Sequence, residues 1–272
     1  MNADVQFAME LADLAGSMAM ERFGARDLAV QSKLDGSPVT EADRAIEVAL
    51  RERISRDRPE HAITGEELGE SGASEWRWYL DPIDGTTSYI AGRDSWKVLI
   101  ALVRAGEPML AVVDAPAQGS RWWAVRGDGA FRDRRRLRVS STASLEDAKV
   151  SDDWRGTLAG GVGDGGRGTL AGGVGDHPLA RVAARCGEVR PHRGHSFLAV
   201  AAGETDVAVG VGGFAWDYAP MMLIVQEAGG TFTDFRGDVA FDRGEALVSN
   251  GLVHEQARRA IWTPDWTKSV DA

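Results

Sequence analysis

Cysteine is almost missing from this chain of 272 residues, which contains only Cys186. A single cysteine excludes an intramolecular disulfide and a zinc site built from several thiolates, so we expect a protein of the reducing cytoplasm. Basic residues are in the minority, since 31 Lys and Arg face 41 Asp and Glu and give a formal net charge of -10. General nucleic-acid binding requires a basic footprint, so a nucleic-acid polymer is not expected as a partner.

Long apolar runs are also missing. The N-terminal stretch lacks a basic segment followed by an apolar block, and no apolar run approaches the roughly 20 residues of a membrane-spanning helix. We therefore expect no contact with a membrane. The length allows a substantial core, and we predict one domain over residues 1–272, with an N-terminal half to about 150 and a C-terminal half over about 177–263.

A perfect repeat separates the two halves. Residues 155–164 recur letter for letter as 167–176. Residues 161–166 match the dinucleotide fingerprint G-x-G-x-x-G, but no convincing strand precedes them, and the repeat explains the glycines without a cofactor. Two copies are too few for a solenoid, which needs at least three stacked units. We predict a Gly-rich surface loop over 155–176.

The most informative pattern lies at residues 78–87, WYLDPIDGTT. An aromatic and apolar run, predicted to be a buried strand, reaches Asp81 and Asp84 and is followed at once by a glycine and two hydroxyl residues. Pro82 has no N–H and favours an extended residue before it, so we predict that the strand ends there. Two hard oxygen ligands this close suit Mg²⁺. The alternative interpretation is an ordinary turn, for which Pro, Asp and Gly are typical.

Acidic residues stand at comparable positions elsewhere. A predicted strand ends shortly before Glu66, and Asp217 stands where the N-cap of an apolar helix belongs. Thr40 and Asp43 form a capping-box pattern at the start of another helix. Each position has a local structural explanation. One shared site explains better why four carboxylates occur at strand ends or helix starts, namely Glu66, Asp81, Asp84 and Asp217.

Apolar spacings predict helices near both ends of the chain and many strands between them. Spacings of four and three from Val5 to Phe23 are typical of an amphipathic helix. Further helices are predicted over 40–54, 196–202, 216–227 and 253–262, and strands over 61–64, 76–80, 97–103, 109–113, 121–125, 137–139, 206–209, 231–233 and 246–249. The basic cluster at 132–136 is predicted to be a solvated turn. The pattern favours a layered α/β protein whose sheets are covered by helices.

The acidic motifs, in the order in which they occur along the chain, resemble those of the inositol monophosphatase family of metal-dependent phosphatases. The resemblance rests on GEE at 65–67, DPIDGTT at 81–87 and WD at 216–217, with support from 33–43 and 227–230. It implies an α+β layered sandwich of αβαβα type, like that of fructose bisphosphatase, assembled as a homodimer. It also implies a Mg²⁺-dependent phosphoric monoester hydrolase that acts on a small phosphorylated metabolite.

The resemblance implies roles only for residues that match the family motifs. One Mg²⁺ would be held by Glu66, Asp81 and the backbone carbonyl of Ile83, and a second by Asp81, Asp84 and Asp217. Glu66 counts as catalytic as well, because it also helps to hold a third ion. Asp43 and Thr86 would orient and deprotonate the attacking water. The N–H groups of Gly85 and Thr86, at a helix N-terminus, would receive phosphate oxygens. Asp217 and, apart from the resemblance, His195 and Arg193 are further candidates for contact with the substrate.

The chemistry is coherent on physical grounds as well. A phosphate monoester dianion repels hydroxide, so a catalyst must neutralise charge, generate a nucleophile near neutral pH and stabilise the leaving alkoxide. Two metal ions held by clustered carboxylates supply all three, and a helix N-terminus supplies N–H donors to phosphate oxygens. An aspartyl-phosphate mechanism is the alternative. Asp81 and Asp84 are better used as ligands than as its nucleophile.

Within the family the chain resembles the histidinol-phosphate phosphatase branch most, through residues 121–127, 129–131 and 216–219. A histidinol-phosphate-like substrate is therefore the first expectation. Two acids typical of relatives that bind histidinol or inositol phosphates are missing, because Gly210 and His195 stand in their places. Losing both removes the natural partners of a cationic amine or a polyol.

A modestly basic patch of His192, Arg193 and His195 is present instead. It is either ordinary solvated surface or a site for a substrate with extra negative charge or an aromatic base. A nucleotide or sugar monophosphate phosphatase of specialised metabolism is therefore the main alternative, followed by an inositol monophosphatase. A non-catalytic binding protein is a further alternative. The intact carboxylates argue against it, because clustered carboxylates repel one another without a cation.

Overall fold

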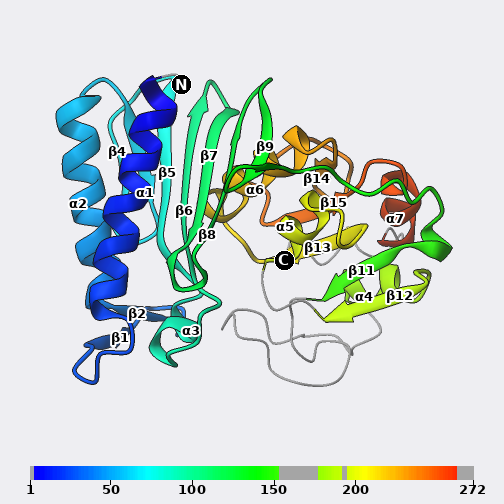
Figure 1. Ribbon diagram of the computed structural model, residues 1–272, viewed down its shortest axis with the longest axis horizontal. Coiled ribbons are helices and arrows are strands. Elements are labelled where there is room, and N and C mark those ends of the chain that lie inside the picture. The colour runs from blue at the N-terminus through cyan, green and yellow to red at the C-terminus, as the bar shows by residue number, and fades with distance from the viewer. Residues whose placement is uncertain (1–2, 153–176, 192–194, 262–272) are drawn as a thin grey trace.

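The computed structural model describes residues 3–152, 177–191 and 195–261. The duplicated segment 155–176, His192 and Arg193 lie outside the described residues. Figure 1 shows layers in the order helices, sheet, helices, sheet, helices, which confirms the predicted αβαβα sandwich. The three helical layers consist of α1 (Ala3–Arg22) with α2 (Glu41–Asp57), α5 (Ser196–Ala201) with α6 (Ala215–Glu227), and α4 (Pro178–Ala183) with α7 (His254–Ile261).

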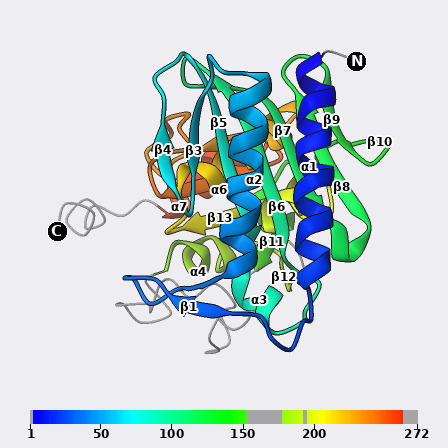
Figure 2. The same ribbon diagram turned by 90° about the vertical axis from the view of Figure 1, so that its left-hand side faces the viewer.

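The larger sheet has eight strands in the order β10-β9-β8-β7-β6-β5-β3-β4. Neighbours pair antiparallel except β3 and β5, which are parallel. Figure 2 shows α1 and α2 lying across its outer face. The strands are β3 (Ala62–Gly65), β4 (Gly69–Ser71), β5 (Trp76–Asp84), β6 (Lys97–Arg104), β7 (Glu107–Ala115), β8 (Ser120–Val125), β9 (Gly129–Arg132) and β10 (Arg135–Arg136).

The smaller sheet has five strands in the order β12-β11-β13-β15-β14. Its strands are β11 (Lys149–Asp152), β12 (Glu188–Pro191), β13 (Val207–Val211), β14 (Thr231–Thr233) and β15 (Glu245–Ser249). A separate hairpin of β1 (Val30–Ser32) and β2 (Pro38–Thr40) lies beside the short helix α3 (Thr86–Ile90). Short 3-10 helices are η1 (Pro116–Gln118) and η2 (Leu145–Asp147).

Strand β6 shows why its sequence is continuously apolar rather than alternating. Leu99 and Ala101 belong to the core shared with α6, whereas Val98 and Ile100 belong to the core shared with α1 and α2. Successive side chains of a strand point to opposite faces, and helices cover both faces here. A strand buried on both sides therefore has no position for a polar residue along most of its length.

The region after β8 differs from the prediction. Residues 137–139 were expected to form a strand, but the Leu137 N–H donates to the carbonyl of Ala130 and the Val139 N–H to that of Ala228. Because these carbonyls belong to different elements, no ladder forms. The solvated turn predicted at 132–136 is present as the exposed tip of a tight hairpin of β9 and β10, in which Asp133 adopts a φ of 55°.

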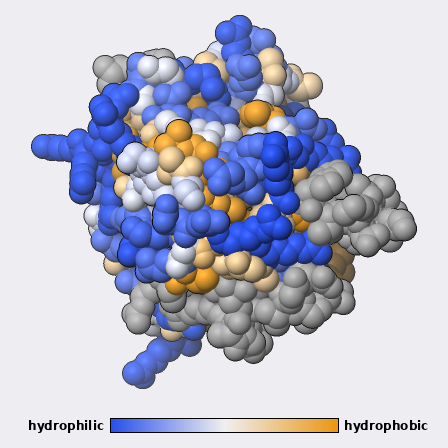
Figure 3. Space-filling view, turned by 90° about the vertical axis from the view of Figure 1, so that its right-hand side faces the viewer, coloured by the Kyte–Doolittle hydropathy of each residue, from blue (hydrophilic) through white to orange (hydrophobic). Residues whose placement is uncertain are grey.

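The described surface shows no broad apolar face in the view of Figure 3, where hydrophobic residues lie in groups interrupted by hydrophilic ones. Within residues 3–152, 177–191 and 195–261, no helix combines the length and the apolar character needed to cross a bilayer.

His254 at the start of α7 is a buried histidine held by two hydroxyl groups. Its Nε2 lies 2.9 Å from Thr233 Oγ1 and its Nδ1 lies 2.9 Å from Ser249 Oγ. Since the Thr233 hydroxyl donates to the carbonyl of Asp234, it accepts from Nε2–H, and Nδ1 accepts from Ser249. Burial lowers the pKa of His254 from 6.5 to about 4. The fold therefore requires the neutral imidazole.

We expect this histidine to make the protein acid-sensitive. Between pH 6.5 and about 4 the unfolded chain binds a proton that the folded chain rejects, so the free energy of unfolding falls as the pH falls through this window. The loss attributable to His254 is about 3 kcal/mol. Urea unfolding at pH 7 and pH 4 measures it, and His254→Gln should show a smaller loss. An equal loss in both proteins contradicts this assignment.

Candidate active site

Strand β5 carries the paired carboxylates at its C-terminal end. The strand was predicted to end at Pro82 but continues through Asp84, with a shift in its register against β6 between Asp81 and Asp84. In a regular strand, residues three apart point to opposite faces. The register shift occurs at Pro82, which has no backbone N–H to donate to a neighbouring strand. It lets both carboxylates line the same cleft.

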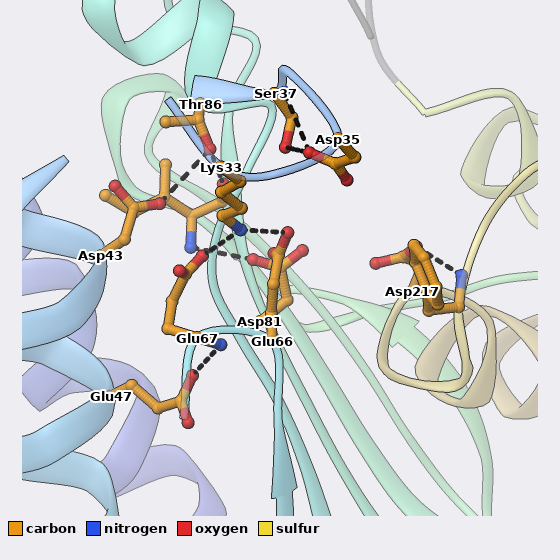
Figure 4. Close-up of polar contacts among 12 residues, drawn as sticks. Lys33, Asp35, Ser37, Asp43, Glu47, Glu66, Glu67, Asp81, Thr86 and Asp217 are labelled. Atoms are coloured by element: carbon orange, nitrogen blue, oxygen red, sulfur yellow. Dashed lines mark hydrogen bonds and ion pairs between the residues drawn. The ribbon is translucent and has the colours of Figure 1, made fainter. Parts of the chain in front are cut away.

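The cleft has a volume of about 270 Å³ and lies between the two halves of the chain. That size suits a small metabolite. In Figure 4, Asp217 faces Glu66 and Asp81 across it. Most of the predicted site residues line this cleft, namely Glu66, Asp81, Ile83, Asp84, Gly85, Thr86, His195 and Asp217. Asp43 lies directly behind Thr86, and Arg193 lies outside the described residues.

The carboxylates lie close enough to disturb one another. Burial raises the pKa of Asp81 well above its usual value, and the charges of Glu66, Asp84 and Asp217 raise it further. Burial also raises the pKa of Asp84, although the neighbouring ammonium of Lys97 opposes this effect. Such a cluster is stabilised by a cation, because each added negative charge is otherwise costly.

Two lysines at the site were not anticipated. The Nζ of Lys33, from the loop between β1 and β2, lies 2.9 Å from Glu66 Oε1 and 2.5 Å from Glu67 Oε1. Burial nevertheless raises the pKa of Glu67 to about 7. Lys97 is only 3% exposed and pairs with Asp84 in the register of β5 and β6. Sequence spacing gave no signal for either, since each reaches the site through tertiary packing.

Asp43 sits at the start of α2 in the predicted capping box. Its Oδ2 accepts the backbone N–H and the hydroxyl of Thr40 at 2.8 and 2.5 Å. Its Oδ1 lies 3.3 Å from the hydroxyl of Thr86, which also lies 3.1 Å from the carbonyl oxygen of Ile83. Burial raises the pKa of Asp43, and the hydrogen bonds from Thr40 oppose that effect. The contacts place a hydroxyl and a carboxylate together beside the cleft.

Gly85 precedes α3 with a φ of 85°, a conformation that favours glycine. The tight turn brings the backbone of Gly85 and Thr86 to the wall of the cleft. Because α3 has only five residues, its contribution comes from individual N–H groups rather than from a long helix dipole. The predicted helix N-terminus at this position is thus confirmed.

Asp217 is not the N-cap that the sequence suggested. Helix α6 begins two residues earlier, at Ala215, and Phe214 is the N-cap residue. The Oδ2 of Asp217 accepts the backbone N–H of Phe214 at 2.7 Å. The carboxylate therefore bends back over the helix start, and one of its oxygens is used for capping.

The wall opposite β5 is aromatic. A Cβ atom at Gly210 would lie 2.7 Å from Phe197 Cζ and 2.8 Å from the Tyr218 hydroxyl, so these rings fill the space of the acid expected there in relatives. Phe214, which is 42% exposed, stacks on Trp216 with ring centroids 4.8 Å apart. Among the described residues that line this wall, Asp217 is the only acid. A polyol or a cationic amine finds few partners on this wall.

The described residues contain no group of three or more His, Cys, Asp or Glu side chains that could hold a metal ion as they stand. Glu66 is paired with Lys33, and Asp217 is bound to the N–H of Phe214. The donor types and their convergence on one cleft nevertheless suit a hard divalent cation, since carboxylate and carbonyl oxygens are the ligands that Mg²⁺ prefers.

Comparison with known proteins gives a consistent result. A model of the inositol monophosphatase family matches residues 2–264. The chain is 39% identical to the histidinol-phosphatase of Streptomyces coelicolor, over 93% of this chain and 94% of that protein. It is 38% identical to the histidinol-phosphatase of Mycobacterium tuberculosis, over 93% and 95% of the two chains. Among solved structures, an IMPase of Thermotoga maritima superposes with a TM-score of 0.79 at 30% identity, covering 99% of this chain and 100% of that one.

Proposed function

The chain belongs to the inositol monophosphatase family, and from this premise we propose that its carboxylate cleft binds Mg²⁺ and hydrolyses the phosphate ester of a small alcohol that carries an aromatic ring. The protein is a phosphomonoesterase, as its family and relatives are phosphatases. The observation that carries the proposal is the convergence of Glu66, Asp81, Asp84 and Asp217 on one cleft of metabolite size.

Metal binding is assigned to the acidic residues at the end of β5 and around it. Asp81 would contact both of two ions, together with Glu66 and the carbonyl of Ile83 for one and with Asp84 and Asp217 for the other. When bound, the ions supply charge neutralisation and a water of lowered pKa. The raised pKa of Asp81 supports the assignment, because burial and the neighbouring carboxylates disfavour its charged form, which a bound cation would stabilise.

The remaining steps fall to residues of the chain. Asp43 and Thr86 orient the attacking water and remove its proton in a relay. The water gives its proton to the Thr86 hydroxyl, which gives its own proton to Asp43 Oδ1 at 3.3 Å, while Oδ2 is fixed by Thr40. The N–H groups of Gly85 and Thr86 hold phosphate oxygens in line with that water. No side chain needs to become phosphorylated.

The substrate class follows from the aromatic wall. Flat rings pack favourably against aromatic side chains, and His195, which lies 5.1 Å from Phe197 between ring centroids, offers a further planar group. Histidinol phosphate and nucleoside monophosphates both carry a planar ring, whereas inositol phosphate does not. The names of the two bacterial relatives favour histidinol phosphate as the first candidate, and a nucleotide is the second. The ammonium group of histidinol phosphate would need an acidic partner away from this wall, where Asp217 is the only acid among the described lining residues.

Phosphate release from a panel of esters tests this substrate class. We expect histidinol phosphate or a nucleoside monophosphate to give a kcat/KM at least about 10-fold above that of inositol 1-phosphate, the usual size of a discrimination made by packing. Phe214→Ala should lower the ratio between esters with an aromatic ring and esters without one. A preference for inositol 1-phosphate or a sugar phosphate without an aromatic ring contradicts the aromatic-wall assignment.

The family resemblance also supports a single domain, a homodimer and a cytoplasmic location. The partner is a small phosphorylated metabolite, and the net charge of -10 argues against a nucleic-acid polymer. Analytical ultracentrifugation of the purified protein distinguishes a dimer from a monomer.

A further inference from the structure

Glu47 is a buried carboxylate on α2, one helical turn after Asp43 and outside the cleft. Its side chain is 0% exposed. Its Oε2 accepts the backbone N–H of Glu67 at 2.7 Å, as Figure 4 shows, and its Oε1 accepts that of Leu68 at 3.1 Å. A buried carboxylate is costly unless it is paired and hydrogen-bonded, so these contacts explain how Glu47 is tolerated.

Arg51 lies one turn further along α2 and completes the arrangement. Its Nε donates to Glu47 Oε1 at 2.7 Å. One terminal nitrogen donates to Ser71 Oγ at 3.0 Å and the other to the carbonyl oxygen of Gly69. The two side chains of α2 therefore hold the β3–β4 connection together. Glu47 binds the turn between the strands, and Arg51 binds strand β4.

Gly65, the residue before Glu66, is required by close approach. A Cβ atom at this position would lie 2.1 Å from Glu47 Oε1 and 2.3 Å from Glu47 Cδ. The carboxylate thus lies directly against the backbone at the end of β3. Both neighbours of Glu66 therefore contact Glu47: Gly65 packs against its carboxylate, and Glu67 donates its backbone N–H to it.

We propose that Glu47, supported by Arg51, is a positioning residue that directs Glu66 into the cleft. The inference rests on the proposed function, which makes Glu66 a metal ligand. Glu47 touches neither substrate nor metal and acts through the backbone on either side of Glu66. Because Asp43 is on the same helix, α2 holds the metal-binding turn and the water-orienting carboxylate in a fixed relation.

Glu47→Gln tests the proposal. The amide keeps the shape of the side chain but turns an NH₂ group either toward the N–H of Glu67 or toward both the N–H of Leu68 and Arg51 Nε, so Glu66 is no longer fixed. We expect Mg²⁺ alone, titrated calorimetrically without substrate, to bind 10- to 100-fold more weakly, the usual cost of losing a group that orients a metal ligand. Amide hydrogen exchange at Glu67 and Leu68 should accelerate.

Two further variants keep the test decisive. Gly65→Ala displaces the carboxylate with a methyl group without changing any charge, and we expect weaker Mg²⁺ binding in the same direction. Asp57→Asn is the matched control, because Asp57 pairs with Arg53 at the same i,i+4 spacing on α2 but is bound by guanidinium groups. It should leave Mg²⁺ affinity unchanged.

The outcomes separate the inference from the proposed function. Folded Glu47→Gln and Gly65→Ala proteins with wild-type Mg²⁺ affinity overturn the positioning role while leaving the phosphatase assignment intact. An equal loss in Asp57→Asn also overturns it, because the effect would then be general to the helix. A wild-type protein that neither binds Mg²⁺ nor releases phosphate overturns the proposed function and, with it, this inference.

Discussion

Asp84→Asn is expected to abolish phosphate release while the protein stays folded. The substitution removes a negative charge from the second proposed metal site at nearly constant volume. Stabilisation of transition-state charge by a metal ion is worth several kcal/mol, so kcat should fall about 10³-fold or more. The melting temperature without metal should change little, because burial and Glu66 disfavour the charged form of Asp84 whereas the ammonium of Lys97 favours it.

Asp94→Asn is the matched control for this experiment. It makes the same chemical change ten residues further along the chain, at an exposed position outside the residues that line the cleft. It should retain wild-type kcat. Substantial activity in a folded Asp84→Asn protein would rule out the two-metal assignment of this residue.

Asp43→Asn is expected to give the second large effect, on chemistry rather than on metal binding. The amide cannot take the proton of the attacking water, and a positioned general base typically contributes 10²- to 10⁴-fold, so kcat should fall by about that factor. Mg²⁺ affinity measured by calorimetry should be unchanged, since Asp43 is not a proposed ligand. The capping box loses at most about 1 kcal/mol, because Asn still accepts one hydrogen bond from Thr40.

Substitutions at Thr86 separate the hydroxyl from the bulk of the side chain. Thr86→Ser keeps the oxygen that lies 3.3 Å from Asp43 Oδ1, whereas Thr86→Val removes it with little change in volume. We expect kcat to fall strongly in the Val variant only.

Loss of Mg²⁺ binding in Asp43→Asn, with unchanged kcat at saturating metal, would assign Asp43 to the metal site instead.

Local patterns predicted much of this fold. The capping box at Thr40 and Asp43, the hairpin of β6 and β7 and the long helix α1 all depend on residues near one another in the chain, and the structure contains them. The acidic motifs also predicted which carboxylates would meet. The family resemblance supplied the layer order that periodicity alone leaves open.

Other features depend on contacts that sequence spacing does not reveal. Pro82 indicated the end of a strand, yet β5 continues through an irregular register because β6 pairs again with Asp84. Lys33 reaches Glu66 from a separate hairpin. The crowding at Gly210 follows from the rings of α5 and α6, so the missing acid could be read from the sequence but its aromatic replacement could not.

Phosphate release from histidinol phosphate, measured against Mg²⁺ concentration after removal of metal by a chelator, tests the proposed metal-dependent cleft most directly. We expect no release without metal, recovery that saturates with added Mg²⁺, and no recovery in Asp84→Asn. A nucleoside monophosphate and inositol 1-phosphate run in parallel extend the test beyond one substrate. Release that persists in the chelator, or no release from any ester when Mg²⁺ is bound, would contradict the assignment of this cleft as a Mg²⁺-dependent phosphatase site.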